Sequence, residues 1–120
     1  MLGIKTEGQA GQPAFYVPKY LQGAGFHVIP VPVYYANVKH ILGQEVFRRL
    51  ADIPMDIDLV NIFRLSQDIP PHVEDILAKM PKAVWLQSGI RNDAVAETLA
   101  QAGIKVVQDR CIMVEHRCLK

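Results

Sequence analysis

The sequence predicts an α/β fold, with a doubly wound and mainly parallel sheet that carries helices on both faces. Short, almost continuous apolar runs alternate along the chain with longer segments in which apolar residues recur at helical spacing. Glycine, proline and asparagine mark the borders between the two kinds of segment. Because strands covered on both faces read as continuous apolar runs, the alternation indicates parallel strands joined by helical crossovers.

Four buried strands are expected from runs rich in β-branched residues. These runs cover residues 28–31, 59–63, 83–86 and 104–107. A further strand should precede the first loop, and this fold places it near the centre of the sheet, yet only residues 1–4 are available for it. We therefore expect a truncated first strand that lacks part of its upstream half, unless another chain or a rearranged edge supplies the pairing.

Three helices are expected between the strands. Their apolar stripes are Val17, Tyr20, Leu21 and Ala24; Val73, Ile76, Leu77 and Met80; and Val95, Leu99 and Ala102. Since proline is tolerated only in the first turn of a helix, Pro18 predicts that the first helix begins near Ala14 or Phe15. Asn92 suits the N-cap of the third helix.

Residues 32–58 are less regular. We expect a loop, then a short strand or turn near residues 43–47, and a short helix around residues 48–51. The 120 residues contain no repeat or linker, so they are expected to form a single domain over residues 1–120.

The composition narrows the classes of function. A net charge of +1 gives no broad basic field for nucleic acid or an anionic membrane, so neither is expected as a partner. No apolar run reaches the roughly 20 residues of a membrane helix. Two cysteines predict a reducing compartment, the cytoplasm, although an upstream targeting segment would change that expectation.

The first candidate site is the loop that joins the shortened strand to the first helix. It carries Gly3, Gly8 and Gly11 together with Lys5 and Thr6. Free N–H groups at such a loop can hold a pyrophosphate, and glycine lets the backbone approach it closely. The spacing matches neither of the common phosphate-binding glycine motifs, so a flexible solvated loop is an equal alternative.

The second candidate group follows the later strands, on the edge where doubly wound sheets bind ligands. Its members are Phe63, Arg64 and Ser66; Gln87 and Gly89; and Cys111. Arginine can pair with a phosphate through two hydrogen bonds, and a strand-end thiol can meet the thiol of a ligand. The alternatives are a solvated arginine, a helix-capping serine, a glycine that only makes a turn and an ordinary buried cysteine.

Metal and acid–base chemistry find little support in the sequence. The four histidines share no ligand spacing, and no Cys-x-x-Cys pair occurs, so no metal site is expected. Glu115 and His116 are adjacent, and adjacent side chains point in different directions, so we expect a surface pair and no catalytic residue.

From Gly25 onward the chain resembles the small stand-alone CoA-binding proteins, whose fold is the CoA-binding domain of the succinyl-CoA synthetase α subunit. The segments that carry the resemblance are 25–31, 41–46, 50–54, 58–66, 83–89, 109–111 and 115–116, and residues 13–21 look like the first helix of that family. The resemblance implies a Rossmann-like fold that binds coenzyme A or acyl-CoA. It places the phosphates at the loop with Lys5 and Thr6, and it implies that Val31 and Pro32 line the cleft with the later strand ends. Cys111 matches a strand-end cysteine of the family, close to the reach of the CoA thiol.

Four functions remain open at this point. The first is a small, soluble and non-catalytic CoA-binding protein, and the second is a redox protein that forms a mixed disulfide with CoA through Cys111. The third is a nucleotide-dependent enzyme, either a ligase or an NAD oxidoreductase. No carboxylate follows the second strand at residues 32–35, where a dinucleotide enzyme needs one. The fourth is a remnant without a ligand.

Overall fold

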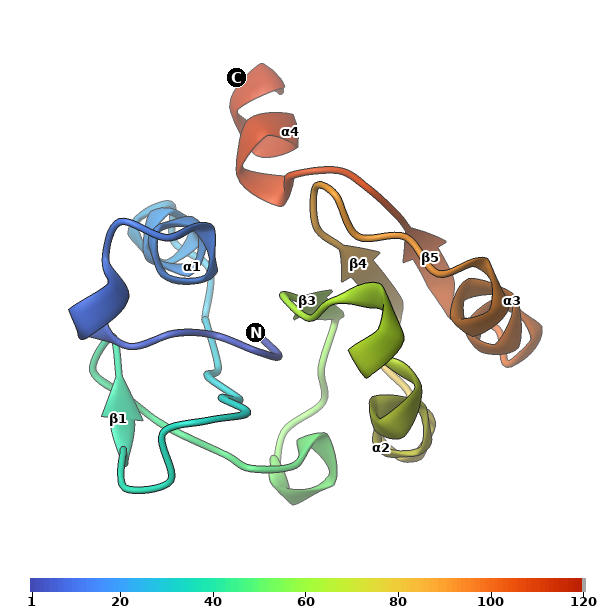
Figure 1. Cartoon of the computed structure of the whole chain (residues 1–120), viewed down its shortest axis with the longest axis horizontal. Helices are drawn as coiled ribbons and strands as arrows, with labels where there is room; N and C mark the ends of the chain where they lie inside the picture. Colours follow the sequence, from blue (N-terminus) through green and yellow to red (C-terminus); the bar gives the residue numbers. More distant parts are fainter. Residues whose placement is uncertain (120) are drawn as a thin grey trace.

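A computed structural model describes residues 1–119 and confirms the α/β class. Its central sheet holds β3 (Leu59–Ile62), β4 (Ala83–Leu86) and β5 (Lys105–Val107), which run parallel in the order β3-β4-β5. β4 covers the residues expected from the sequence, and β3 and β5 are each one residue shorter than expected. Parallel strands need crossovers, and the helices between them supply these (Figure 1).

The first strand is a stub in the middle of the sheet. Leu2 forms parallel bridges to both Val31 and Ile62, so this single residue extends the ladder from β3 to the segment that ends at Val31. The expected strand at residues 28–31 has no regular strand geometry beyond that bridge, because only Leu2 is present to pair with it. The position of the shortened strand therefore agrees with expectation.

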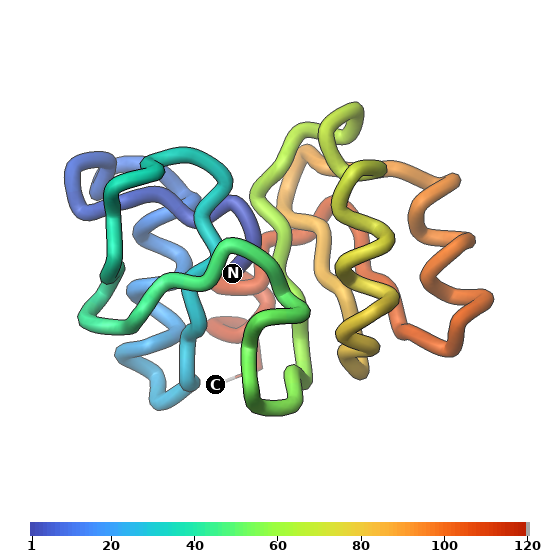
Figure 2. Tube along the Cα trace, turned by 90° about the horizontal axis from the view of Figure 1, so that it is seen from below, coloured from blue at the N-terminus to red at the C-terminus, as the bar shows by residue number. Residues whose placement is uncertain are grey.

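Helices cover both faces of the sheet. α2 (Val73–Lys79) and α3 (Asp93–Gln101) pack on one face, where Ile76, Val95 and Leu99 join the main core. α1 (Pro13–Gly23) and α4 (Ile112–Cys118) lie together over the other face. Figures 1 and 2 show these two pairs on either side of the strands.

The start of α1 differs from expectation, because the helix begins at Pro13 and Pro18 lies inside it. An internal proline leaves the carbonyl four residues earlier without its helical donor. That carbonyl belongs to Ala14, and the backbone N–H of Lys5 donates to it at 3.1 Å. The glycine-bearing loop is thus attached to the position that Pro18 leaves open.

The later helices follow their capping signals. The Asn92 side chain accepts a hydrogen bond from the N–H of Val95 at 3.1 Å, as expected for an N-cap. Met80 was expected in the second apolar stripe, but it ends α2 in the left-handed conformation and is largely exposed. α4 was not expected from the sequence.

The irregular middle of the chain forms a hairpin and a short 3₁₀ turn. β1 (His40–Ile41) pairs antiparallel with β2 (Gln44–Glu45), slightly earlier than the expected strand or turn. The short helix expected around residues 48–51 is the 3₁₀ turn at Leu50–Asp52. None of the helices within residues 1–119 has the length and apolar character needed to cross a bilayer.

Candidate functional site

The carboxyl ends of the parallel strands define one rim of the sheet. Because Leu2, β3, β4 and β5 all run in the same direction, the residues that follow each of them emerge at this rim. The expected site residues at this rim are Gly3, Val31, Pro32, Phe63, Arg64, Ser66, Gln87, Gly89 and Cys111. We refer to this edge as the carboxyl rim.

Gly3 is the tightest point of the carboxyl rim. Its N–H donates to the carbonyl of Val31 at 2.9 Å, and its φ is +83°. A Cβ atom at this position would lie 2.4 Å from the carbonyl oxygen of Phe63 and 3.3 Å from Cδ of Arg64. Only glycine fits, because the obstacle is backbone and the φ already excludes most side chains. Val31 and Pro32 are both buried on the other side of this turn.

The loop after Gly3 folds onto itself. Lys5 Nζ donates to the side-chain oxygen of Gln12 at 2.6 Å, and the Thr6 hydroxyl bonds the side chain of Gln9. Gly8 is exposed in the 3₁₀ turn Glu7–Gln9. The structure therefore places Lys5, Thr6 and Gly8 in one local network. Within residues 1–119 no hydrogen bond or ion pair joins this network to Arg64, Gln87 or Cys111.

Arg64 is the cation of the carboxyl rim. Its guanidinium lies over the Tyr34 ring, 5.6 Å from the centroid, and Nη1 donates to the Tyr34 hydroxyl at 3.4 Å. Its Nε is buried and has no hydrogen-bond partner among residues 1–119. Burial lowers the pKa of His72, and the nearby Arg64 charge lowers that pKa further. Arg64 thus presents an unsatisfied donor and a positive charge at this rim.

Ser66 behaves as a structural residue. Its hydroxyl donates to the carbonyl of Arg91 at 2.7 Å, and its own carbonyl accepts a hydrogen bond from Asn92 at 3.1 Å. These bonds fix the turn after β3 against the N-terminus of α3. Ser66 therefore sets the position of the neighbouring Arg64 turn.

Gln87 connects β4 to the C-terminal helix. Its side-chain oxygen accepts a hydrogen bond from the N–H of Ile112, the first residue of α4, at 3.0 Å. The residue is only 4% exposed, and its Nε2 has no partner among residues 1–119. A buried amide nitrogen without an acceptor lowers the stability of the fold by about 1–3 kcal/mol. A ligand that accepts a hydrogen bond from this nitrogen would remove that cost.

Cys111 lies at the N-cap of α4, next to this amide. It is partly buried, and it packs with Phe63 against the apolar cluster of Val17, Leu21 and Val28. It also lines a shallow hollow with Arg91, Gln108, Arg110 and other residues. Residues that follow β3 and β5, Phe63 and Cys111, therefore pack on the same apolar cluster.

Gly89 forms the turn beside this hollow. Its N–H donates to the Asp109 carboxylate at 2.7 Å, and its φ is +82°. Asp109 also has a positive φ, of 56°, which is unusual outside glycine. The two turns after β4 and β5 thus hold each other in place.

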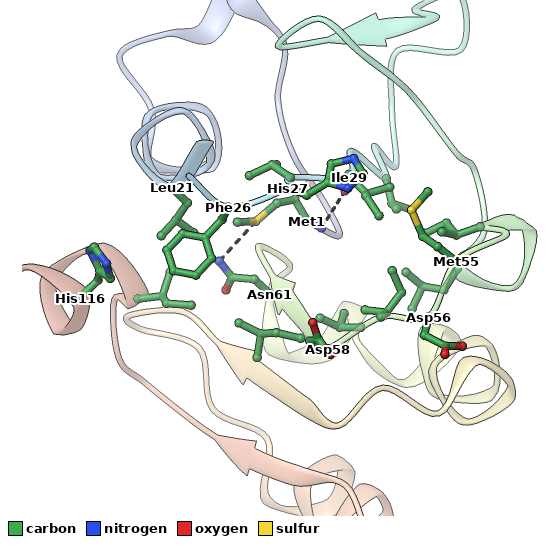
Figure 3. A pocket seen from close by; sticks show the side chains of 18 residues that line it. Met1, Leu21, Phe26, His27, Ile29, Met55, Asp56, Asp58, Asn61 and His116 are labelled. Atoms are coloured by element: carbon green, nitrogen blue, oxygen red, sulfur yellow. Dashed lines mark hydrogen bonds between the residues drawn. The ribbon is translucent and has the colours of Figure 1, made fainter. Parts of the chain in front are cut away.

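A further cavity lies elsewhere. It has a volume of about 300 Å³ and lies between the segment 26–31 and the segment 55–61, with Met1 between them (Figure 3). Because these residues precede the strand ends, the cavity belongs to the amino side of the sheet, opposite the carboxyl rim.

Several residues of the rim were not expected from the sequence. Tyr34 was not among the expected site residues, yet the Arg64 guanidinium lies over its ring. Arg48 fixes the loop of Tyr34, since it donates to the carbonyls of Tyr34, Tyr35 and Val38 at 2.8–3.0 Å. The adjacent pair Glu115 and His116 separates: Glu115 pairs with Arg110 at 3.2 Å, and His116 bonds Tyr20 at 2.9 Å.

Comparison with known proteins identifies the class to which this fold and rim belong. Residues 2–117 match the family described as "CoA binding domain". The match covers nearly the whole chain, so the protein belongs to the CoA-binding domain family.

Individual relatives are similar to this chain over most of its length. The chain is 34% identical to the uncharacterized protein YneT of Bacillus subtilis (strain 168) over 104 residues, which are 87% of this chain and 75% of that one. A Thermus thermophilus protein solved as "cell-free ID.343" superposes with a TM-score of 0.89 and 36% identity, covering 99% of this chain and 88% of that chain. A hypothetical protein from Pyrococcus horikoshii OT3 gives a TM-score of 0.87 and 30% identity, covering 98% and 80%.

A larger enzyme shares the fold. The dinucleotide-forming acetyl-coenzyme A synthetase 1 of Ca. Korarchaeum cryptofilum, solved with phosphate and ADP, gives a TM-score of 0.69 at 17% identity. The likeness covers 88% of this chain and 24% of the synthetase chain, so it shows a common Rossmann-like fold.

Proposed function

We propose that this protein binds coenzyme A or an acyl-CoA at the carboxyl rim and carries out no chemistry on it. One observation of the structure carries the proposal. Two buried hydrogen-bond donors, Nε of Arg64 and Nε2 of Gln87, have no partner among residues 1–119, and both lie after parallel strands of the sheet. Coenzyme A is rich in acceptors, since it carries phosphate oxygens and amide carbonyls. The membership of the CoA-binding domain family supports coenzyme A as the ligand.

The role of each residue follows from the geometry. Gly3 keeps the backbone of the first turn close to Phe63, which holds the glycine-bearing loop against the turn of Arg64. Arg64 supplies charge and a donor for a phosphate, and Gln87 supplies an amide donor beside Cys111. Lys5 and Thr6 would contribute by exchanging their local hydrogen bonds for bonds to a phosphate, and Gly8 would contribute its exposed backbone in the same loop.

The test is a calorimetric titration with coenzyme A and with NAD. We expect binding of CoA and none of NAD, since no carboxylate follows residues 28–31 to hold a ribose. Arg64→Gln should weaken CoA binding about tenfold or more, because a charge-assisted bond to phosphate is lost. Arg49→Gln is the matched control, because Arg49 is exposed and its side chain makes no hydrogen bond or ion pair within residues 1–119. Equal loss in both variants, or no binding at millimolar CoA, would refute the proposal.

The position of Cys111 favours a second function, the formation of a mixed disulfide with CoA. It is partly exposed in the hollow of the carboxyl rim, where a bound CoA thiol would emerge. Its thiolate would attack the disulfide of oxidised CoA, form a mixed disulfide and release one CoA thiol. Mass spectrometry after incubation with oxidised CoA tests this. Cys111→Ala should remain unmodified, while Cys118→Ala, the other free cysteine, should be modified as before.

A further inference from the structure

Arg48 lies on a backbone segment that is fixed on both sides. Before it, the N–H of Phe47 donates to the carbonyl of Pro30 at 3.0 Å. After it, the N–H of Leu50 donates to the carboxylate of Asp75, in α2, at 2.7 Å. The fold therefore determines the position from which the Arg48 side chain extends, although that side chain lies at the surface.

The guanidinium of Arg48 holds a strained loop in one shape. Nη1 donates to the carbonyl of Tyr34 at 3.0 Å, and Nη2 donates to the carbonyls of Tyr35 and Val38 at 2.8 and 2.9 Å. The φ of Tyr35 is +63°, a conformation that a residue with a bulky side chain rarely adopts. Three bonds from one charged group offset this strain, and a lysine, with its single nitrogen, cannot reproduce their geometry.

This loop presents an exposed aromatic ring to Arg64. Tyr34 is 66% exposed, the guanidinium of Arg64 lies over its ring, and its hydroxyl accepts a hydrogen bond from Arg64 Nη1 at 3.4 Å. An exposed side chain ordinarily changes rotamer within nanoseconds. Because the bond of 3.4 Å is long, it holds Arg64 only if the backbone that carries Tyr34 stays in place.

The contact with Tyr34 leaves one edge of the Arg64 guanidinium available. Tyr34 engages Nη1, whereas Nε is buried and has no partner among residues 1–119. Nε and Nη2 form the edge of a guanidinium that can donate two parallel hydrogen bonds to a phosphate. A side chain that is already held in one conformation loses less freedom when it binds a ligand than a mobile one does.

We propose that Arg48 and Tyr34 are positioning residues for phosphate binding by Arg64. Arg48 fixes the loop, Tyr34 holds Nη1 of Arg64, and the edge with Nε is thereby kept toward the ligand. The inference rests on the proposed function, because the phosphate in question is that of coenzyme A. Arg48 acts only through Tyr34 and makes no contact with the phosphate itself.

The first test is a calorimetric titration with CoA of variants at position 48. Arg48→Gln should weaken binding about fivefold, since Arg64 then has to be ordered by the ligand. Arg48→Lys should weaken binding to a similar extent, because it keeps the charge and loses the three-carbonyl geometry. Arg49→Gln is the matched control: Arg49 is the adjacent exposed arginine, has no hydrogen-bond or ion-pair partner among residues 1–119, and should leave the affinity unchanged. Wild-type affinity in Arg48→Lys, or an equal loss in Arg49→Gln, overturns the proposal.

Variants of Tyr34 test the second step. Tyr34→Leu removes the ring and should weaken CoA binding as much as Arg48→Gln does. Tyr34→Phe keeps the ring beneath the Arg64 guanidinium and should restore most of the affinity. If the phenylalanine and leucine variants bind CoA equally well, the ring does not hold Arg64.

A double-mutant cycle separates positioning from general damage to the fold. In an Arg64→Gln background, Arg48→Gln should cause no further loss of CoA affinity, because the group that it positions is gone. A structural role of Arg48 would add its full loss in both backgrounds, and that result contradicts the proposal.

A readout without ligand distinguishes failure of this inference from failure of the proposed function. The Arg64 charge lowers the pKa of His72, in addition to burial, while Asp75 and Asp68 raise it. In Arg48→Lys, Arg64 spends less time in its fixed place, so the pKa of His72, measured by NMR titration, should rise, as it should in Arg64→Gln. Absence of CoA binding by the wild-type chain refutes the proposed function. An unchanged pKa of His72 in Arg48→Lys refutes the positioning role whether or not CoA binds.

Discussion

At the scale of single residues, Gly3 shows how a missing side chain positions the candidate site. Two features disfavour a Cβ atom at this position. The φ of Gly3 is +83°, and the carbonyl oxygen of Phe63 would lie 2.4 Å from the Cβ. We predict that Gly3→Ala costs about 3 kcal/mol or more of unfolding free energy and abolishes CoA binding, because backbone strain and a backbone clash add. Urea denaturation and a CoA titration measure the two effects.

Gly103→Ala is the matched control for that prediction. Gly103 has a similar φ of +89°, but nothing lies within 4 Å of its Cβ position. It should lose about 1 kcal/mol from the φ term alone and keep its CoA affinity. Equal destabilisation by the two substitutions would show that the contact with Phe63 is relieved by movement of the strand end.

The Met1 amino group gives a pH dependence of folding. Burial lowers its pKa from 8.0 to about 5. Between those values the unfolded chain holds a proton that the folded chain does not, so the unfolding free energy rises with pH from about 5 to 8 and is then constant. The slope approaches about 1.4 kcal/mol per pH unit. Urea denaturation between pH 5 and 9 measures it.

His72 contributes with the same sign at lower pH. Burial and Arg64 lower its pKa from 6.5, so its stabilising effect is also lost as pH falls below that value. The interval from pH 6.5 to 8 therefore isolates Met1. A chain extended before Met1 no longer carries a buried amino group at this position and should show no slope there, whereas a slope that persists in the extended chain must come from another group.

At the scale of elements, α1 and the glycine-bearing loop are linked through a proline. Pro18 leaves the carbonyl of Ala14 without a helical donor, and Lys5 N–H takes that place at 3.1 Å. We predict that Pro18→Ala restores the helical bond and releases Lys5. Net stability should change by less than about 1 kcal/mol, because the regained helical bond offsets the lost buried ring, while amide exchange of Lys5 speeds up.

The same substitution should weaken CoA binding a few-fold, since the loop with Lys5 and Thr6 loses its anchor. Hydrogen exchange and calorimetry on the same sample measure both effects. Thr98→Ala is a suitable control, because Thr98 makes an exposed bond within α3 to the carbonyl of Ala94 and should leave both readouts unchanged. Unaltered exchange at Lys5 in Pro18→Ala would show that the loop is held by the network of Gln9 and Gln12 instead.

The elements that could be predicted from the sequence are those whose signals are local. β4 has the expected bounds because its apolar run is closed on both sides by polar or proline residues, and Asn92 caps α3 as its position indicated. The position of Pro18 could not be predicted, because the donor that compensates it lies nine residues before the accepting Ala14. α4 was missed for a related reason: its first N–H is satisfied by Gln87, which is distant in sequence.

In the candidate site, too, some features could be predicted from the sequence and others could not. Topology alone predicts which strand ends share the carboxyl rim, so Phe63, Gln87 and Cys111 could be grouped from the sequence. The partners of those residues could not, because Tyr34 reaches Arg64 only through a loop that Arg48 holds in place. Those contacts depend on side chains from three separate loops. The spacing of apolar residues within one segment does not predict which side chains of distant loops meet.

At the scale of the whole molecule, the stub at residues 1–3 joins two parts of the sheet. Leu2 bridges Val31 on one side and Ile62 on the other, and the next residue, Gly3, forms part of the carboxyl rim. The stub is held by bonds to Val31 and to the β3 segment, with Leu2 as its only bridged residue. Such a short strand has little pairing of its own, so its order depends on what lies at either end.

Binding of CoA at the carboxyl rim should therefore order this stub. The N–H of Leu2 donates to the carbonyl of Asn61 at 2.9 Å, and the N–H of Gly3 donates to the carbonyl of Val31 at 2.9 Å. We predict that saturating CoA slows hydrogen exchange at these two amides, because a ligand that contacts the turn at Gly3 disfavours the opening of both bonds. NAD at the same concentration serves as the control and should leave the exchange unchanged. Unchanged exchange at both amides while CoA is bound would show that the stub is fully ordered by its existing bonds.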